Sequence, residues 1–231
     1  MIPLKDDIRT VRFPIVTVAL IAANALAFLW QLQVGLDASV LRGGAIPYEV
    51  LTFQDVYPPD LVPPPFTVLT SMFLHGGWIH LGFNMLTLWI FGNNVEDALG
   101  RMRFVAFYVA SGVVAAVAQA VASTMAGYAE VPMVGASGAI AGVLAGYLVL
   151  FPYARVLTAI VVVIFVRLVY LPARLFIIGW FVLQVLPVIF GGGAPGGGIA
   201  FFAHIGGFVA GLALVKLVGR RSNWRGRPVS W

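Results

Sequence analysis

The sequence predicts an all-α integral membrane protein in which six transmembrane helices form one bundle and both termini are cytoplasmic. Apolar residues make up 61% of the 231-residue chain and charged residues only 10%, whereas soluble domains contain about 45–50% and about 25%. The mean hydropathy is +0.97, and a soluble protein of this size cannot hide that much apolar surface. The chain has no cysteine, which excludes disulfides, Cys-ligated metals and thiol catalysis.

Six segments approach the roughly 20 mostly apolar residues that a membrane-spanning helix needs. They cover residues 13–35, 76–92 (with an apolar lead-in from 66), 104–126, 137–151, 172–190 and 199–218. Residues 157–169 are also apolar, but the stretch is short, β-branched and interrupted by Arg167, so we interpret it as a connection at the membrane interface. Because the tails are short, residues 1–231 are expected to form a single membrane domain without a separate soluble one.

The distribution of basic residues predicts the orientation. With six spans, every lysine and arginine except Arg42 falls on the same side as the termini. Basic residues are retained in the cytoplasm, so both termini are expected there, in a multi-pass protein of a cell inner or plasma membrane. The net charge of +5 thus reflects topology, and no nucleic-acid partner is expected, because no basic run is interleaved with aromatic residues.

Four polar residues within the spans are expected to lie in one layer of the bilayer. His80 and His204 lie four to five residues inside the outer ends of their helices, and Ser137 opens its own helix from the outer side. At about 1.5 Å per residue, these groups lie about 5–10 Å below the outer surface. Asn84 follows His80 by one turn on the same face. Polar groups inside a membrane are costly and usually functional.

Small residues occupy one face of each helix that would have to bring serine and histidine together. Gly138 and Gly142 are four residues apart after Ser137, and Gly207 and Gly211 are four apart after the histidine. Such faces let helix backbones approach closely, and a serine side chain is too short to reach across a wider gap. We therefore predict that these glycines pack the fourth and sixth helices against each other.

The four residues are those that nucleophilic catalysis needs. A serine is activated by a histidine acting as general base, and His80 and Asn84 can donate hydrogen bonds to an oxyanion. Each feature also has an ordinary interpretation. A membrane serine usually bonds its own helix, His80 and Asn84 could form interhelical hydrogen bonds, and a GxxxG pattern by itself indicates only packing. Their shared depth favours the catalytic hypothesis.

Three motifs follow one another along the chain: HGGWIHLGFN at residues 75–84, GASG at 135–138 and AHIGG at 203–207. They resemble the rhomboid family of intramembrane serine proteases, and the resemblance extends over about residues 66–211. It implies a six-helix rhomboid-like fold that cleaves transmembrane helices of membrane protein substrates without a cofactor or metal. It also implies Ser137 as nucleophile, His204 as general base, and His80 with Asn84 as the oxyanion-binding pair.

Two other classes of protein are weighed against this one. A zinc hydrolase could use the three histidines of the chain. However, His75 and His80 are five residues apart, the sequence contains no HExxH motif, and no carboxylate is available as a base. A noncatalytic rhomboid-like membrane chaperone or extraction factor would share the fold, but such relatives typically lack the serine or the histidine. Some rhomboids stack a tyrosine on the catalytic histidine, where this chain has Ala141.

The glycine-rich stretch 191–198 is expected to form a mobile cap over a site open to the non-cytoplasmic side.

Overall fold

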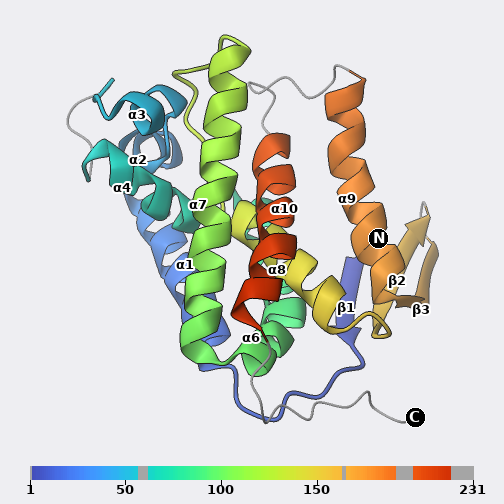
Figure 1. The fold of residues 1–231 in the computed structure, drawn as a ribbon. Coiled ribbons are helices and arrows are strands. Elements are labelled where there is room, and N and C mark those ends of the chain that lie inside the picture. Colours follow the sequence, from blue (N-terminus) through green and yellow to red (C-terminus); the bar gives the residue numbers. More distant parts are fainter. Residues whose placement is uncertain (1, 57–61, 163–164, 191–199, 220–231) are drawn as a thin grey trace.

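A computed structural model describes residues 2–56, 62–162, 165–190 and 200–219 (Figure 1). Its main helices are α1 (Ile15–Val34), α7 (Arg101–Met125), α8 (Ser137–Leu150), α9 (Ala173–Ile189) and α10 (Phe201–Val218). Shorter helical elements are α2 (Leu36–Gly43), α3 (Pro47–Thr52), α4 (Pro64–Thr70), the 3-10 turn η1 (Ser71–Phe73), α5 (Trp78–Thr87), the π-helical turn η2 (Leu88–Gly92) and α6 (Asn93–Leu99). The strands are β1 (Ile2–Asp6), β2 (Arg155–Val162) and β3 (Phe165–Pro172). The expected cap at 191–198 lies outside the described residues.

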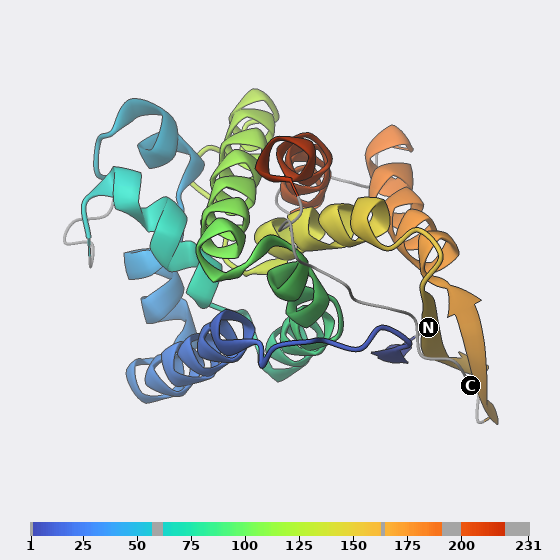
Figure 2. The same ribbon diagram turned by 60° about the horizontal axis from the view of Figure 1, so that its bottom comes forward.

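Helices α1, α7 and α10 are each long and apolar enough to cross a membrane, whereas α8 and α9 are apolar but shorter. Helix α8 lies in the centre of the bundle, behind α7 and α10 in Figure 1 and between them and α5–α6 in Figure 2. Most of its residues are buried. Because other helices surround α8, it has no need of the polar face that a surface helix presents to water.

The second predicted span differs from the observed helix at both ends. The observed helix begins at Trp78 and continues through η2 and α6 to Leu99, whereas the predicted span starts near Gly76 and ends near Gly92. Gly92 keeps helical dihedral angles, with φ −65° and ψ −40°, so it does not end the helix. The apolar lead-in from residue 66 forms the separate elements α4 and η1.

A carboxylate on α6 fixes where α1 begins. Helix α1 follows Pro14, and the first N–H groups of a helix have no partner within it. Glu96 is buried and accepts hydrogen bonds from the backbone N–H of Val16 at 3.0 Å and of Thr17 at 2.7 Å. It also accepts one from the Thr17 hydroxyl at 2.8 Å. This cap joins the first helix to the end of the second.

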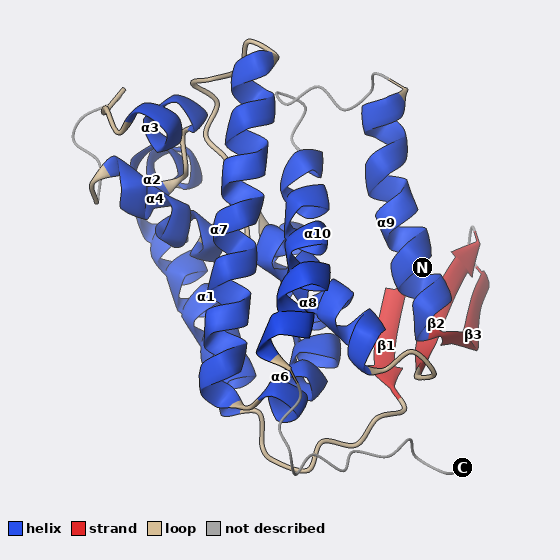
Figure 3. Cartoon of the chain, in the orientation of Figure 1, coloured by secondary structure: helices blue, strands red, loops and turns tan. Residues whose placement is uncertain are grey.

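The fold is mostly helical, as expected, but it is not all-α, because the described residues also form an antiparallel three-stranded sheet in the order β1-β2-β3. The sheet lies at the edge of the bundle beside the start of α9 (Figure 3). Within the stretch 157–169, predicted as an interfacial connection, the described residues 157–162 and 165–169 belong to the paired strands β2 and β3, in which Arg155 is opposite Pro172. Their β-branched side chains favour strands, and β1 supplies a second partner for β2.

Strand β1 is tied to the bundle through a carboxyl group. Asp6 Oδ2 accepts hydrogen bonds from Asn94 Nδ2 at 2.6 Å and from the Tyr147 hydroxyl at 2.5 Å. The neighbouring Asp7 accepts one from the backbone N–H of Arg155 at 2.8 Å. Burial raises the pKa of Asp6 to about 7, and the charge of Asp7 adds to the rise, while the Tyr147 hydrogen bond opposes it. The folded protein therefore favours the protonated Asp6.

Docking of β1 should weaken as pH rises. The pKa of Asp6 is higher in the folded protein, at about 7, than its ordinary value of 3.8. The stabilisation is therefore complete below the ordinary value and is lost as pH approaches the folded one. Amide hydrogen exchange of residues 2–6, corrected for its intrinsic pH dependence, should be slower at pH 5 than at pH 8. In Asp6→Asn this difference between the two pH values should disappear. An unchanged difference would show that Asp6 is not the group whose titration weakens the docking of β1.

Candidate active site

Ser137 is the first residue of α8, at the end of a turn that requires glycine. Gly135 has φ +128°, in the left-handed region that favours glycine, and its N–H donates to the Ser71 carbonyl at 2.8 Å. The chain then turns through Ala136 into α8. The first N–H groups of α8 have no partner within the helix and carry partial positive charge, so Ser137 lies at the helix end where such donors occur.

Helix α10 brings His204 to Ser137. The distance between His204 Nε2 and Ser137 Oγ is 2.8 Å, which is a hydrogen bond between side chains 67 positions apart in sequence. The start of α10 is held by Gln119 of α7, whose Oε1 accepts a hydrogen bond from the Ala203 N–H at 3.1 Å. Gln119 Nε2 in turn donates to the Ser123 hydroxyl at 3.0 Å. These contacts determine where the histidine enters the bundle.

The glycines predicted to pack α8 and α10 lie against each other in the structure. A Cβ atom at Gly207 would overlap the carbonyl oxygen of Gly138, and one at Gly211 would overlap that of Gly142. On α8, a Cβ atom at Gly138 would lie 2.5 Å from the Cβ of Ala115 on α7. Helices α8 and α10 therefore meet at backbone contact, and α7 packs against α8 through Ala115. This close approach gives the short serine side chain its reach.

His80 lies beside the same turn. The Gly76 N–H lies 3.3 Å from His80 Nδ1, which therefore accepts this hydrogen bond. In a neutral imidazole the other nitrogen then carries the proton, so Nε2 is a donor. A Cβ atom placed on Gly135 would lie 2.9 Å from His80 Nε2 and 3.6 Å from Ser137 Oγ. The donor and the serine thus flank one backbone position.

Asn84, one turn further along α5, is buried, and within the described part of the chain its Nδ2 has no hydrogen-bond partner. His75 is also buried, and both its ring nitrogens lack a partner among the described residues. Its ring contacts that of His80 edge-on, with centroids 5.0 Å apart. Gln31 of α1 holds the His75 backbone, accepting from its N–H at 2.8 Å and donating to its carbonyl at 3.3 Å.

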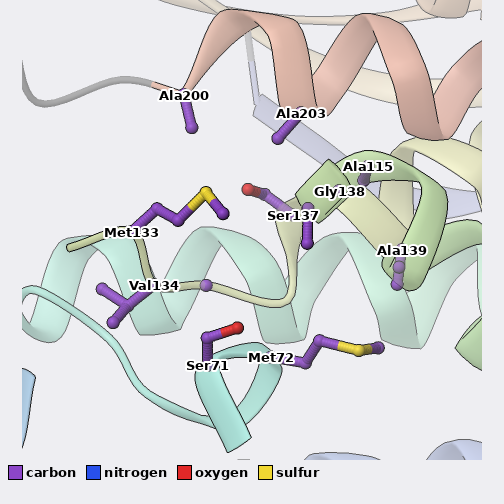
Figure 4. Close-up of a pocket in the computed structure, with 13 residues that line it drawn as sticks. Ser71, Met72, Ala115, Met133, Val134, Ser137, Gly138, Ala139, Ala200 and Ala203 are labelled. Carbon is purple, nitrogen blue, oxygen red and sulfur yellow. The ribbon is translucent and has the colours of Figure 1, made fainter. Parts of the chain in front are cut away.

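A small pocket adjoins Ser137. Figure 4 shows the serine hydroxyl pointing toward a space bounded by Met133, by Ala203 of α10 and by Ala200, which directly precedes that helix. Most of the remaining lining residues are small, and they come from η1, α7, α8 and the turn before α8, with Met72 of η1 at the far side. The cavity volume is only about 30 Å³, so it has room for a small side chain but not for a large one.

Two residues of α9 contact His204 and were not predicted. Gln184 Oε1 lies 2.8 Å from His204 Nδ1, and the Trp180 ring packs against the imidazole with centroids 5.6 Å apart and planes at 44°. Trp180 thus provides the aromatic contact that Ala141 cannot. Gln184 lies six residues before the end of the predicted fifth span. The depth argument used for His204 would therefore have found it.

No group of three or more His, Cys, Asp or Glu side chains suited to a metal ion occurs in the described ranges. The histidines instead contact each other, the serine and neutral amides.

Comparison with known proteins identifies the relationship. The model of the Rhomboid domain matches residues 64–221. The chain belongs to the rhomboid family. This rhomboid protein is therefore a membrane protein with transmembrane helices, from a family that includes serine proteases.

Three curated relatives illustrate the range of similarity. The chain is 37% identical to Rhomboid protein 1, mitochondrial, of Saccharomyces cerevisiae over 42% of this chain and 29% of the relative. It is 33% identical to Rhomboid-type serine protease 2 of Emericella nidulans, over 68% of this chain and 28% of the relative. It is 29% identical to the mitochondrial Presenilin-associated rhomboid-like protein of Mus musculus, over 97% of this chain and 52% of the relative. The chain thus spans about half or less of these relatives.

The relatives do not support the expected plasma-membrane location, because two of these three are named as mitochondrial. The positive-inside rule predicts on which side of the bilayer the termini lie, but it does not identify which cellular membrane holds the protein. The multi-pass membrane assignment itself does not depend on that choice.

Proposed function

We propose that this chain is an intramembrane serine endopeptidase that cleaves transmembrane segments of membrane proteins with a Ser137–His204 dyad. The observation that carries the proposal is the 2.8 Å hydrogen bond between Ser137 Oγ and His204 Nε2. A neutral imidazole that accepts the serine proton generates the nucleophile. Membership of the rhomboid family and the resemblance to a relative named as a serine protease point to the same chemistry.

In the proposed reaction, Ser137 Oγ attacks the carbonyl carbon of the scissile peptide while His204 Nε2 takes its proton. The tetrahedral intermediate collapses as His204 gives that proton to the leaving amine, which leaves an ester on Ser137. A water molecule then attacks the ester carbonyl and gives a proton to His204. As the second tetrahedral intermediate collapses, His204 returns that proton to Ser137 Oγ, which releases the carboxyl product and restores the serine and the neutral histidine. The reaction uses no metal or cofactor.

We propose His80 and Asn84 as side-chain donors to the oxyanion, together with the backbone N–H groups at the start of α8. His80 Nε2 carries a proton because Nδ1 accepts from Gly76, and it lies near the Gly135 turn. The buried Asn84 Nδ2 has no hydrogen-bond acceptor among the described residues, so its N–H groups are available to donate. Donors that are already in position stabilise charge as it develops.

We also propose the topology that the charge pattern favours. Helix α1, the continuous α5–α6 segment, α7, α8, α9 and α10 would be six spans of one membrane domain. Both termini would be cytoplasmic, because basic residues gather on that side of the sequence. The dyad would then open to the non-cytoplasmic side, from which the water for hydrolysis would enter.

His80→Ala and Asn84→Ala should each lower kcat by about 10- to 1,000-fold with little change in KM. The reason is that each removes a donor that acts mainly on the transition state. Steady-state cleavage of a transmembrane substrate in detergent micelles measures both constants. A rise in KM at unchanged kcat would show that the two residues only line a substrate-binding surface.

The experiment that tests the proposal is cleavage of a generic single-span membrane protein by purified protein in liposomes, with products sequenced. Cleavage should occur within the spanning segment and should continue in the presence of a chelator. A substrate with alanine at the cleaved position should be preferred to one with phenylalanine, because the cavity beside Ser137 has a volume of only about 30 Å³. Absence of cleavage despite correct folding would favour the noncatalytic chaperone or extraction factor. Chelator-sensitive cleavage would favour a metal hydrolase.

A further inference from the structure

Both ring nitrogens of His204 have partners, on opposite sides of the ring. Nε2 is 2.8 Å from the serine hydroxyl, and Nδ1 is 2.8 Å from Gln184 Oε1 on α9. An amide oxygen is only an acceptor, so Nδ1 must carry the proton that it shares with Gln184. In a neutral imidazole, Nε2 is then unprotonated and free to accept the hydroxyl proton of Ser137.

We propose that Gln184 is the positioning residue of the dyad: it fixes the tautomer and ring orientation of His204 and so makes the base competent. The inference rests on the proposed protease function and adds a third member to it. After proton transfer the imidazolium donates from both nitrogens, and Gln184 continues to accept from Nδ1. The role resembles that of the carboxylate in a catalytic triad, but the acceptor here is neutral.

The location of Gln184 makes the dyad depend on α9. Trp180, Phe181 and Gln184 lie on one face of this helix. Trp180 packs on His204, and Phe181 stacks on Phe208 of α10 with centroids 4.2 Å apart. The buried residues of α9 are confined to its first five positions, Ala173 to Ile177. Around His204, the helix therefore meets α10 through this partly exposed face, and its docking there sets the base.

His80 is the titratable residue that interacts electrostatically with His204. The other groups that contact the ring, Ser137 of α8 and Trp180 and Gln184 of α9, are uncharged at neutral pH. A charge introduced at position 184 should therefore act strongly on the titration of His204. This gives a readout that lost packing alone would not change.

The test compares Gln184→Leu and Gln184→Glu with wild type in cleavage of one transmembrane substrate between pH 5 and pH 9. Gln184→Leu should lower kcat by up to about a hundredfold, because the ring is no longer held. Gln184→Glu should restore most of the rate at high pH. The acid limb of its pH–rate profile should move to higher pH by about one unit or more, since a carboxylate beside His204 favours the protonated imidazole. Leu183→Ala, an exposed neighbour on α9, is the matched control and should match wild type.

Equal rates and an identical acid limb in wild type, Gln184→Leu and Gln184→Glu would overturn the inference. Equal losses in both variants with an unshifted acid limb would also overturn it, because they would indicate a packing role. The proposed function is judged separately, since its failure would show as a wild-type protein that neither cleaves substrate nor reacts at Ser137.

Discussion

Replacing Ser137 with alanine should abolish cleavage, with a loss of kcat of at least about a thousandfold, because no other group can supply the nucleophile. His204→Ala should have a similar effect, since the serine would lose the base that accepts its proton at 2.8 Å. Cleavage is measured on a transmembrane substrate with each purified variant. Melting temperature and helix content should stay near wild type, because Ser137 and His204 are only half-buried and neither side chain dominates the packing of its helix.

Ser111→Ala is the matched control for the serine substitution. Ser111 is a buried serine of α7 whose hydroxyl has no hydrogen-bond partner among the described residues. Its removal should leave cleavage near wild type. If Ser137→Ala still cleaved at a substantial rate while Ser111→Ala did not, the nucleophile would have to be sought elsewhere.

Substitution of Gly207 should inactivate the protein although this residue performs no chemistry. A Cβ atom there would overlap the Gly138 carbonyl oxygen, so even Gly207→Ala must move α10 relative to α8, and Gly207→Leu must move it further. A displacement of about 1 Å can cost about a hundredfold in rate when reacting groups must keep their geometry. The melting temperature should fall in the same order, because small-residue contacts hold membrane helices together.

Gly179→Leu is the control for this series. Among the described residues, no atom outside the backbone and neighbours of Gly179 on α9 lies within 4 Å of a Cβ built there, and its backbone is not in the left-handed region. Gly219 also has open space, but it ends α10 with φ +65°, where any side chain is strained. Gly207→Leu with near wild-type cleavage, measured well below its melting temperature, would mean that serine and histidine do not depend on this interface.

The sequence was informative where one helix could be considered at a time. Depth counted from the helix ends suggested that Ser137 and His204 share a layer, and the structure joins them by a hydrogen bond. The glycine spacing suggested which faces meet, and Gly207 lies against Gly138. Both arguments depend only on local periodicity and on the rise of a helix.

The features that the sequence did not reveal depend on contacts between distant segments. Strand β1 forms only because residues 2–6 pair with β2, about 150 positions later. Helix α6 extends the second span because Glu96 finds unpaired N–H groups on α1. Gln184 lies at a depth in its span that marks it as a candidate, but its contact with His204 depends on the position of α9.

The most direct test of the central claim is reaction of the purified protein with a fluorophosphonate, followed by mass spectrometry of its peptides. The account predicts one adduct, on Ser137, that forms rapidly in wild type, is absent from Ser137→Ala and forms much more slowly in His204→Ala. Such a result would show a serine activated by this histidine. An adduct on another residue, or labelling of Ser137 that is equally fast without His204, would contradict the dyad.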